Sequence, residues 1–375
     1  MLLNPKPDGL VGIGRKGGRS GAPGALTLNV KLSVLDLVPV RTNQTTSDAL
    51  AASVSLAQAA DRLGYERYWV AEHHNMAAVA ATSPPVLIAH LAAHTHRIRI
   101  GSGGVMLPNH APLAVAEQFA MLEAAHPGRI DLGIGRAPGS DPVTSWALRS
   151  GSGRGQEDVL KFPQYLDDVM HMMSERGFTV PISGQNYTIK ATPAARSVPQ
   201  LWLLGSSGFS SHLAADKGLP YVFAHHFSGE GTAEALAAYR AEFRPSVWCE
   251  KPTTFLTVNI VVADTEQEAI ELATPNLQNM ARLVSGQKMG PIDLVEDALA
   301  LDLGAGMDRL VQKGLGRMVI GTPEQVREQL QALAEKFDVD EIMLHPVASA
   351  RRDEDPRTSG ARVRTLELAA EALAS

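Results

Sequence analysis

The chain repeats one unit along most of its 375 residues: a short apolar segment, a tip that is polar or rich in glycine, and an amphipathic helix. Regular alternation of strand and helix implies parallel strands joined by right-handed crossovers. Eight strand candidates favour a closed (β/α)8 barrel, or TIM barrel, over an open doubly wound sheet, and the first candidate lacks the glycine-rich turn of a dinucleotide-binding half. The candidates span residues 32–38, 68–71, 98–105, 130–134, 201–204, 221–224, 255–262 and 341–344.

Helix boundaries between the strands follow from capping residues. Ser47 or Asp48 is expected to cap the first helix, which Gly64 ends. The run Ser83-Pro84-Pro85 predicts the start of the next helix, because proline suits a first turn. Residues 322–325, Thr-Pro-Glu-Gln, form a capping box before a further helix. The inner face of the first helix is predicted to contain Leu50, Val54, Ala57 and Leu63.

Two stretches are too long for the plain loops of a minimal barrel. Residues 137–198, after the fourth strand, and residues 275–318, between the seventh and eighth strands, are predicted to be insertions that cover an active site. Residues 1–28 are rich in glycine, proline and basic side chains, so we expect a disordered arm or a start codon assigned too early. The dinucleotide pattern within that arm, at 12–17, lacks the strand and helix that it needs. One barrel domain is therefore expected over residues 29–375.

Composition excludes several classes of protein. Hydrophobic residues make up 45% of the chain and charged residues 20%, with a net charge of −6 and no basic stripe. These values are ordinary for a globular enzyme and predict neither nucleic-acid binding nor a membrane span. Cys249 is the only cysteine, so an intrachain disulfide is impossible and a reducing, cytoplasmic location is expected.

The second strand candidate ends abruptly in Glu72-His73-His74-Asn75. Barrel enzymes display their reacting groups at such strand ends. Because successive strand residues face opposite ways, only one of the two histidines can face the mouth, and the pair is unsuited to joint metal binding. His73 is the candidate for proton transfer, since imidazole titrates near neutral pH; a structural hydrogen bond is the alternative for either histidine. We expect Glu72 to orient a neighbouring group and His74 and Asn75 to line a substrate pocket.

Glycine and arginine mark the next two strand ends. Gly101, Gly103 and Gly104 lie in the third strand, which indicates either a simple bend or a ligand lying against bare backbone. The fourth strand ends at Gly135-Arg136. A forked guanidinium at this position can bind phosphate or carboxylate, or can form a salt bridge at the rim.

The fifth strand leads into Gly205-Ser206-Ser207-Gly208, directly before a helix. Backbone N–H groups and hydroxyls at the positive end of a helix dipole suit a phosphate, although serine also caps ordinary helices. The sixth strand ends in His225-His226, which we assign to the walls of a substrate pocket rather than to catalysis. We assign no residue of the chain to a metal site.

Four blocks of sequence together resemble the bacterial luciferase-like flavin-dependent monooxygenase family, and in particular its single-chain members. They are residues 69–75 (WVAEHHN), 101–108 (GSGGVMLP), 116–118 (AEQ) and 127–139 (PGRIDLGIGRAPG). The order of the elements extends the resemblance from about residue 30 to the C-terminus.

The resemblance implies a barrel that binds reduced FMN and reacts it with dioxygen to oxidise a small organic substrate through a flavin peroxide. His73 matches the family's catalytic histidine. Gly103-Gly104 match a strand segment behind the flavin ring that often holds a cis peptide bond. Arg136 and residues 205–208 match the region that holds the flavin phosphate. The sequence departs from the luciferases after residue 108, where His110 is displaced, so aldehyde chemistry is not implied.

The resemblance also implies partners. Relatives of this kind are often homodimers, and we expect the same here. The chain has no convincing nicotinamide fingerprint, so reduced FMN is expected to come from a separate reductase.

Three other functions fit parts of the pattern. An oxidoreductase dependent on the deazaflavin F420 has the same barrel and a similar bulged strand, and transfers hydride without oxygen. A flavin-binding protein without catalysis retains the same cofactor residues. A metal hydrolase would use His94 and His96, but these precede the third strand and therefore lie at the barrel end opposite the chemistry.

Overall fold

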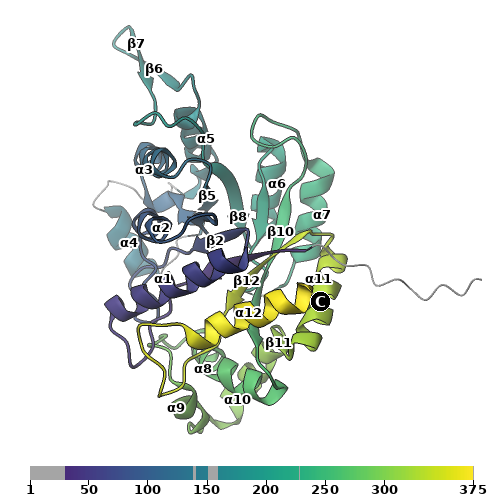
Figure 1. Ribbon diagram of the computed structural model, residues 1–375. Helices are drawn as coiled ribbons and strands as arrows, with labels where there is room; N and C mark the ends of the chain where they lie inside the picture. The colour runs from purple at the N-terminus through teal and green to yellow at the C-terminus, as the bar shows by residue number, and fades with distance from the viewer. Residues whose placement is uncertain (1–29, 138–140, 151–158, 228, 375) are drawn as a thin grey trace, which may run out of the picture.

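The computed structural model describes residues 30–137, 141–150, 159–227 and 229–374 (Figure 1). The arm predicted at residues 1–28 lies outside these ranges. Within them, no helix combines the length and the apolar character that a membrane crossing requires.

Eight parallel strands close into a barrel, so the predicted fold class is confirmed. The ring closes where β9 pairs with β10 and where β12 pairs with β1. The predicted third strand is divided into β3 and a two-residue continuation, β4 (Val105–Met106). A short strand that was not predicted, β11 (Val319–Gly321), pairs with the end of β10. The barrel strands are β1 (Lys31–Asp36), β2 (Arg67–Val70), β3 (Arg99–Ser102), β5 (Ile130–Gly135), β8 (Gln200–Gly205), β9 (Tyr221–Phe223), β10 (Thr254–Val262) and β12 (Glu341–Pro346).

The first helix, α1 (Thr46–Leu63), differs from its prediction at its start. Thr45 is the N-cap, rather than Ser47 or Asp48, because its hydroxyl accepts the Asp48 N–H while the Asp48 carboxylate accepts the Thr45 N–H. Gly64 ends the helix as predicted, with a φ of 79°. The predicted inner face is confirmed in part: Ala57 is fully buried, while Leu50, Val54 and Leu63 are partly buried and pack against the core. The buried apolar residues are Ala49, Ala52, Leu56, Ala57, Ala59 and Ala60.

The other predicted helix starts are confirmed at Pro84 and at Thr322, which forms its capping box with Gln325. Together the helices surround the barrel (Figure 1). The remaining helices are α2 (Pro84–Ala93), η1 (Leu107–Asn109), α3 (Pro112–Ala125), α6 (Gly208–Lys217), α7 (Thr232–Glu242), α8 (Glu266–Val284), α9 (Val295–Leu299), α10 (Gly304–Leu315), α11 (Pro323–Phe337) and α12 (Gly360–Ala374).

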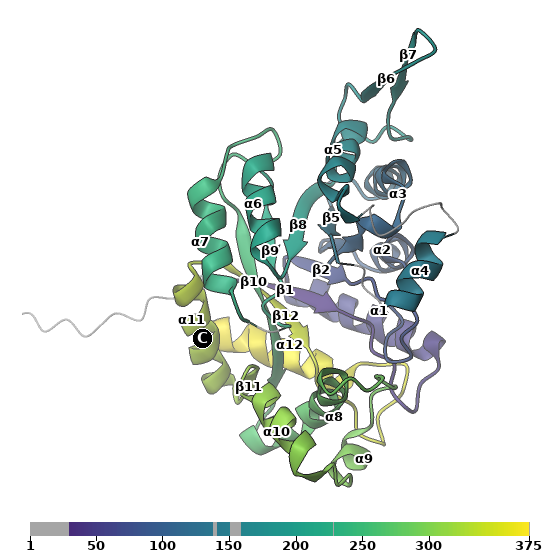
Figure 2. The ribbon, with the colours of Figure 1, turned by 180° about the vertical axis from the view of Figure 1, so that it is seen from behind.

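The first insertion, 137–198, covers the barrel mouth with only part of its described length, since Ala137 and Asp141 line the cavity there. Its described part contains α4 (Pro142–Ser150), α5 (Phe162–Met173) and the hairpin of β6 (Phe178–Ile182) and β7 (Gln185–Ile189). Helix α5 buries an apolar face against α3 and so serves as one of the barrel's outer helices. The hairpin projects away from the barrel (Figures 1 and 2).

The second insertion, 275–318, does lie over the barrel mouth. It contains the second half of α8 and then α9 and α10, and its connecting segment is bonded to the loop after β1. Thr42 N–H donates to the carbonyl of Ile292 (2.9 Å), and Ile292 N–H donates to the carbonyl of Val40 (2.8 Å). Among described residues, this insertion therefore supplies most of the predicted cover, together with Ala137 and Asp141 of the first insertion.

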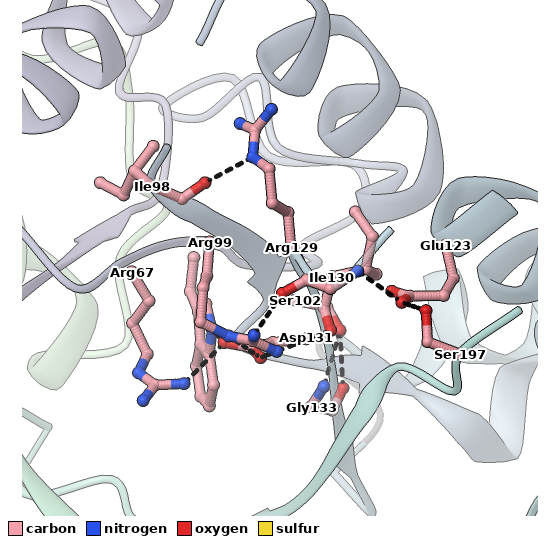
Figure 3. A network of polar contacts seen from close by, with 12 residues as sticks. Arg67, Ile98, Arg99, Ser102, Glu123, Arg129, Ile130, Asp131, Gly133 and Ser197 are labelled. Atoms are coloured by element: carbon pink, nitrogen blue, oxygen red, sulfur yellow. Dashed lines mark hydrogen bonds and ion pairs between the residues drawn. The ribbon is translucent and has the colours of Figure 1, made fainter. Parts of the chain in front are cut away.

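A buried ion network forms the floor of the barrel (Figure 3). The Asp131 carboxylate accepts hydrogen bonds from Arg67 (2.8 Å) and from Arg99 (2.6 and 2.9 Å). Arg67 also donates to both oxygens of Glu341, and the Ser33 hydroxyl donates to Glu341 at 2.6 Å. Both carboxylates are paired, which is the condition under which buried charge is tolerated.

Three aromatic side chains lie directly above this floor. Trp69, Trp202 and Phe255 pack edge to face, with ring centroids 5.0–5.6 Å apart. The Arg67 guanidinium carbon lies 4.9 Å from the centroid of the Trp202 ring, so the two layers are in contact. The lower half of the barrel is therefore solid, and any ligand must bind above it.

We expect Asp131→Asn to lower the free energy of unfolding by about 3–5 kcal/mol, because it removes the counter-ion of Arg99 and leaves the buried Arg67 guanidinium with Glu341 alone. Urea denaturation followed by circular dichroism measures the change. Asp216→Asn is the control, since Asp216 pairs with Arg244 on the surface, and it should change stability little. A loss below about 1 kcal/mol for Asp131→Asn would show that the network is not a structural requirement.

Candidate active site

A cavity of about 710 Å³ lies at the carboxyl ends of the strands. Its inner wall continues the side-chain alternation of the barrel interior. On most strands, the residue two positions after an inward-facing side chain of the aromatic layer lines the cavity. Trp69 is followed by Ala71 and His73, and Met343 by His345. The strand register therefore decides which side chains reach the cavity.

The structure brings the main predicted residues together. His73, Arg136 and Ser207 come from three strand ends and all line this cavity. The same cavity is lined by Gly103, Gly104, Gly205 and Ser206. His226 lines it too, whereas Gly208 is the first residue of α6, directly after the lining residue Ser207.

Three residues predicted to line a substrate pocket are placed elsewhere. His74 Nε2 lies 2.8 Å from a Glu72 oxygen, on the opposite face of the strand end from His73. Asn75 donates to the Thr144 hydroxyl at 3.0 Å. His225 Nδ1 bonds to the Thr232 hydroxyl at 2.8 Å, and its ring meets that of Phe337. None of the three is among the described residues that line the cavity. Alternation turns His74 and His225 away from it, whereas Asn75 lies beyond the strand with a φ of 56°.

Glu72 acts as the orienting group that the sequence predicted. One oxygen accepts from His74 and from His110, each at 2.8 Å, and the other accepts the Met106 N–H at 2.9 Å. Burial alone would raise the pKa of this carboxyl, but the hydrogen bonds from the two histidines and from Met106 lower it to about 2. Glu72 is thus an anchored carboxylate that ties the end of β2 to β4, behind His73.

Two further imidazoles, His226 and His345, face one another with ring centroids 6.0 Å apart. His345 Nδ1 lies 2.8 Å from Asn259 Oδ1, and the Asn259 amide donates to the His226 carbonyl. His226 Nδ1 lies 2.9 Å from the Thr257 hydroxyl, which itself donates to the Phe223 carbonyl. These partners assign the proton of both rings to Nδ1 and leave each Nε2 as an acceptor.

Burial keeps these rings neutral. Desolvation, reinforced by the neighbouring imidazoles, lowers the pKa of His226 to about 4 and that of His345 well below its ordinary value. The pKa of His73 is lowered as well, again chiefly by burial. His73 Nδ1 is buried and has no hydrogen-bond partner among the described residues. A buried polar atom of this kind marks a position where a bound molecule completes the site.

His345 and Asn259 were not identified from the sequence. The predicted eighth strand stopped at residue 344, and His345 is the residue that follows it; β12 continues to Pro346. Counting by twos from Trp69 in β2 gives His73, and the same count from Glu341 gives His345. The alternation of side chains along the strand therefore indicated His345 in the sequence.

Close packing of neighbouring protein atoms requires glycine in this strand. The peptide bond between Gly103 and Gly104 is cis, at the position that the family resemblance implied. A Cβ at residue 101 would lie 2.5 Å from the Asp131 Cβ, and one at residue 104 would lie 2.5 Å from a Leu204 methyl. A bare backbone is thus required by protein atoms, and the cavity wall at Gly103 is flat as a consequence.

Arg136 and the start of α6 form one end of the cavity. The Arg136 guanidinium carbon lies 4.1 Å from the centroid of the Phe209 ring, on the first turn of α6. Among described residues, no carboxylate lies within 4.0 Å of that guanidinium. The Ser207 side chain makes no capping bond, so the first N–H groups of the ten-residue helix are available to an anion.

The sequence pattern of the luciferase-like monooxygenases matches residues 30–340. The chain belongs to the luciferase-like monooxygenase family. It is 39% identical over 319 residues to "Luciferase-like monooxygenase" of Escherichia coli K12, covering 84% of this chain and 91% of that protein. It is 33% identical over 326 residues to "N-acetyl-S-alkylcysteine monooxygenase" of Bacillus subtilis, covering 86% of this chain and 94% of that protein.

Among solved structures, apo-MsnO8 is 36% identical to this luciferase-like monooxygenase, with a TM-score of 0.80 and coverage of 92% of this chain and 98% of that one. Two more distant barrels show the fold alone. One is the oxygenating constituent of 3,6-diketocamphane monooxygenase in complex with FMN (17% identity, TM-score 0.66). The other is an F420-dependent secondary alcohol dehydrogenase (16% identity, TM-score 0.61). The same architecture thus occurs with FMN in one of these proteins and with F420 in the other.

The cavity of this family member has features that fit a flavin. A flat apolar wall formed by Gly103, Gly104 and Leu204 suits a planar ring, the unpartnered His73 Nδ1 lies in the same cavity, and the Arg136 end offers donors for a phosphate. The volume is within the range of sites for molecules of this size. Among described residues, no group of three or more histidine, cysteine or acidic side chains is arranged to bind a metal ion.

The neutral histidines give this chain a defined pH dependence. Between pH 6.5 and about 4 the unfolded chain protonates its histidines while folded His226 does not, so stability falls as the pH falls. Each such histidine contributes up to about 1.4 kcal/mol per pH unit. We expect His226→Gln to flatten the decline measured by urea denaturation across this window. His96→Gln, at an exposed position at the opposite barrel end, should leave the slope unchanged, and an equal slope in both variants contradicts the assignment.

Proposed function

We propose that the chain is a flavin-dependent monooxygenase that uses reduced FMN and dioxygen to oxidise a small organic substrate. One observation carries the proposal: a single cavity joins a glycine wall, an imidazole whose Nδ1 has no partner among the described residues, and, beside a helix N-terminus, an arginine with no described carboxylate within 4.0 Å. These groups suit the ring, the reacting edge and the phosphate of one FMN molecule.

The residues of the chain would hold FMN at two places. Arg136 and the uncapped start of α6 would bind the phosphate, and Phe209 keeps the guanidinium in position. Gly103 and Gly104 would support the ring from below. Reduced FMN supplies two electrons to dioxygen, so that one oxygen atom enters the substrate and the other leaves as water.

His73 would hold or move a proton at Nδ1. Its position depends on the neighbouring Glu72, which is fixed by three hydrogen bonds. The lowered pKa of His73 keeps the ring neutral at pH 7, so that it can accept a proton. The backbone pairing of Val40 and Thr42 with Ile292 closes one side of the mouth and limits access of water.

The substrate would lie in the part of the cavity away from Arg136. This part is lined largely by Met76, Val79, Met280, Leu283, Met289 and Ile292. A thioether or another small molecule with an apolar body fits such a wall, and the name of the Bacillus subtilis relative supports this class. We further propose that a separate reductase supplies the reduced FMN, since no nicotinamide fingerprint accompanies the barrel.

We also propose a homodimer through α2 and α3. Val86 and Met121 expose 68% and 61% of their surface on these two helices. Large exposed apolar side chains on neighbouring helices support an interface there. Analytical ultracentrifugation distinguishes the dimer from a monomer.

Anaerobic titration with reduced FMN and with reduced F420, followed by admission of oxygen, tests the cofactor. The proposal expects tight binding of reduced FMN and oxygen consumption that depends on it. Turnover with reduced F420 in the absence of oxygen would instead identify a hydride-transfer oxidoreductase, and flavin binding without any turnover would identify a non-catalytic flavin-binding protein.

We expect His73→Ala to retain FMN affinity and to lower substrate oxygenation by about 10²–10⁴-fold, the usual contribution of a positioned acid or base. Coupled assays measure product formed per NADH consumed by an added reductase. His74→Ala is the matched control, because His74 faces away from the cavity, and it should lose far less. Equal turnover in His73→Ala and the unmodified enzyme would reject the role.

We expect Arg136→Ala to weaken FMN by about 10–100-fold and riboflavin by much less, because a charge-assisted hydrogen bond to phosphate is lost. Fluorescence quenching measures both dissociation constants on the same protein. Equal losses for FMN and riboflavin would show that Arg136 does not bind the phosphate.

A further inference from the structure

A second cationic side chain, Arg41, lines the same cavity and is not explained by the FMN assignment. It lies in the loop after β1 and is only 8% exposed. Its Nη2 donates to the carbonyls of Pro356 (2.9 Å) and Thr358 (3.1 Å). Its Nε is buried and has no hydrogen-bond partner among the described residues.

No carboxylate neutralises Arg41 at close range. Among described residues, none lies within 4.0 Å of its guanidinium, and the acids that act on it from farther away, Glu354 and Asp355, do not line the cavity. Arg362, the neighbouring cation, is already paired with Asp36 at 2.6 Å. A buried guanidinium with unused N–H groups and no counter-ion is costly unless an anion binds it.

An unused acceptor lines the same cavity as Arg41. Asn279, on α8, is 1% exposed and lines the cavity. Its amide nitrogen donates to the Gly290 carbonyl at 3.0 Å, which fixes the orientation and leaves Oδ1 buried without a partner. Arg41 pairs with Ile292, two residues beyond Gly290. The backbone of Arg41 and the side-chain amide of Asn279 are therefore bound to the same short segment, and both residues line the one cavity.

We propose that this part of the cavity binds the substrate as an N-acylated amino acid or a similar amido acid with an apolar side chain. Arg41 receives the carboxylate, Asn279 Oδ1 accepts the amide N–H, and the methionine and aliphatic wall holds the apolar chain. The inference rests on the proposed function and narrows its substrate class. Arg41 and Asn279 act as specificity residues at the end of the cavity that FMN does not require.

The test is calorimetric titration of the full chain loaded with oxidised FMN. The probes are N-acetylmethionine, its uncharged primary amide, and 6-(methylthio)hexanoate, which has the carboxylate and thioether but no amide N–H. We expect N-acetylmethionine to bind about 10–100-fold more tightly than its amide, as a charge-assisted hydrogen bond predicts, and about 2–10-fold more tightly than the hexanoate.

Arg41→Gln should remove the preference for acid over amide and leave the affinity for the amide unchanged. Gln44→Ala is the matched control, because Gln44 donates to the same Pro356 carbonyl. It loosens the same loop and keeps the charge, so the preference should remain. Arg41→Lys, which also keeps the charge, should retain part of it.

Four results would overturn the proposal. For the unmodified protein they are equal binding of acid and amide, or binding of neither probe. For the variants they are an equal loss of acid affinity in Arg41→Gln and Gln44→Ala, or a loss of FMN affinity in Arg41→Gln as large as its loss of acid affinity. If FMN itself does not bind, the proposed function fails separately, and the same titrations on the unliganded chain still decide whether Arg41 recognises a carboxylate.

Discussion

Asp131 is the carboxylate on which the interior of this barrel depends. It accepts two hydrogen bonds from Arg99, one from Arg67 and one from the Trp69 indole at 2.9 Å. Its side chain and the indole occupy the space that a Cβ at residue 101 would need, so glycine there is a consequence of the floor network. Trp69 held in this way supports the layer on which the cavity rests. The cavity wall that suits a cofactor ring therefore depends on the ion network below it. Ion pairs at one end of the barrel help to fix the geometry of the catalytic end.

Much of the fold and part of the site could be predicted because both follow from short-range periodicity. All eight barrel strands were identified, since each is an apolar run bounded by turn and capping residues. His73 could be placed because one of two adjacent histidines must face inward, and the structure selects the one that lies an even number of residues from Trp69. The same rule explains why His74 and His225 are outside the cavity and His226 inside. His345 was missed only because its strand was ended one residue too early.

The rest of the site depends on contacts that no local pattern records. Glu72 orients His74, as expected, but its second imidazole partner is His110, which lies beyond β4. Arg41 and Asn279 are brought to the same segment by backbone bonds between the loop after β1 and the connection after α8. How the two long insertions share the cover of the mouth was equally hidden, because both have ordinary amphipathic helices. Among described residues, six of the second insertion and two of the first line the cavity, and this division follows from tertiary packing.

The distribution of charge within the cavity follows from these contacts and limits how a ligand can lie. The centre contains His73, His226 and His345, which burial holds neutral. Three arginines line the cavity: Arg362, which is paired with Asp36, Arg136 beside α6, and Arg41 beneath the second insertion. Among described residues, neither Arg136 nor Arg41 has a carboxylate within 4.0 Å; the first lies against an aromatic ring and the second donates to backbone carbonyls. Since a cation is costly in such surroundings unless an anion joins it, molecules with an anionic group at one end are favoured at either place. An uncharged ring between them experiences little net field, so two anionic ligands can be oriented toward each other across a neutral centre. The arrangement supports a cofactor and a substrate that enter separately and meet at His73.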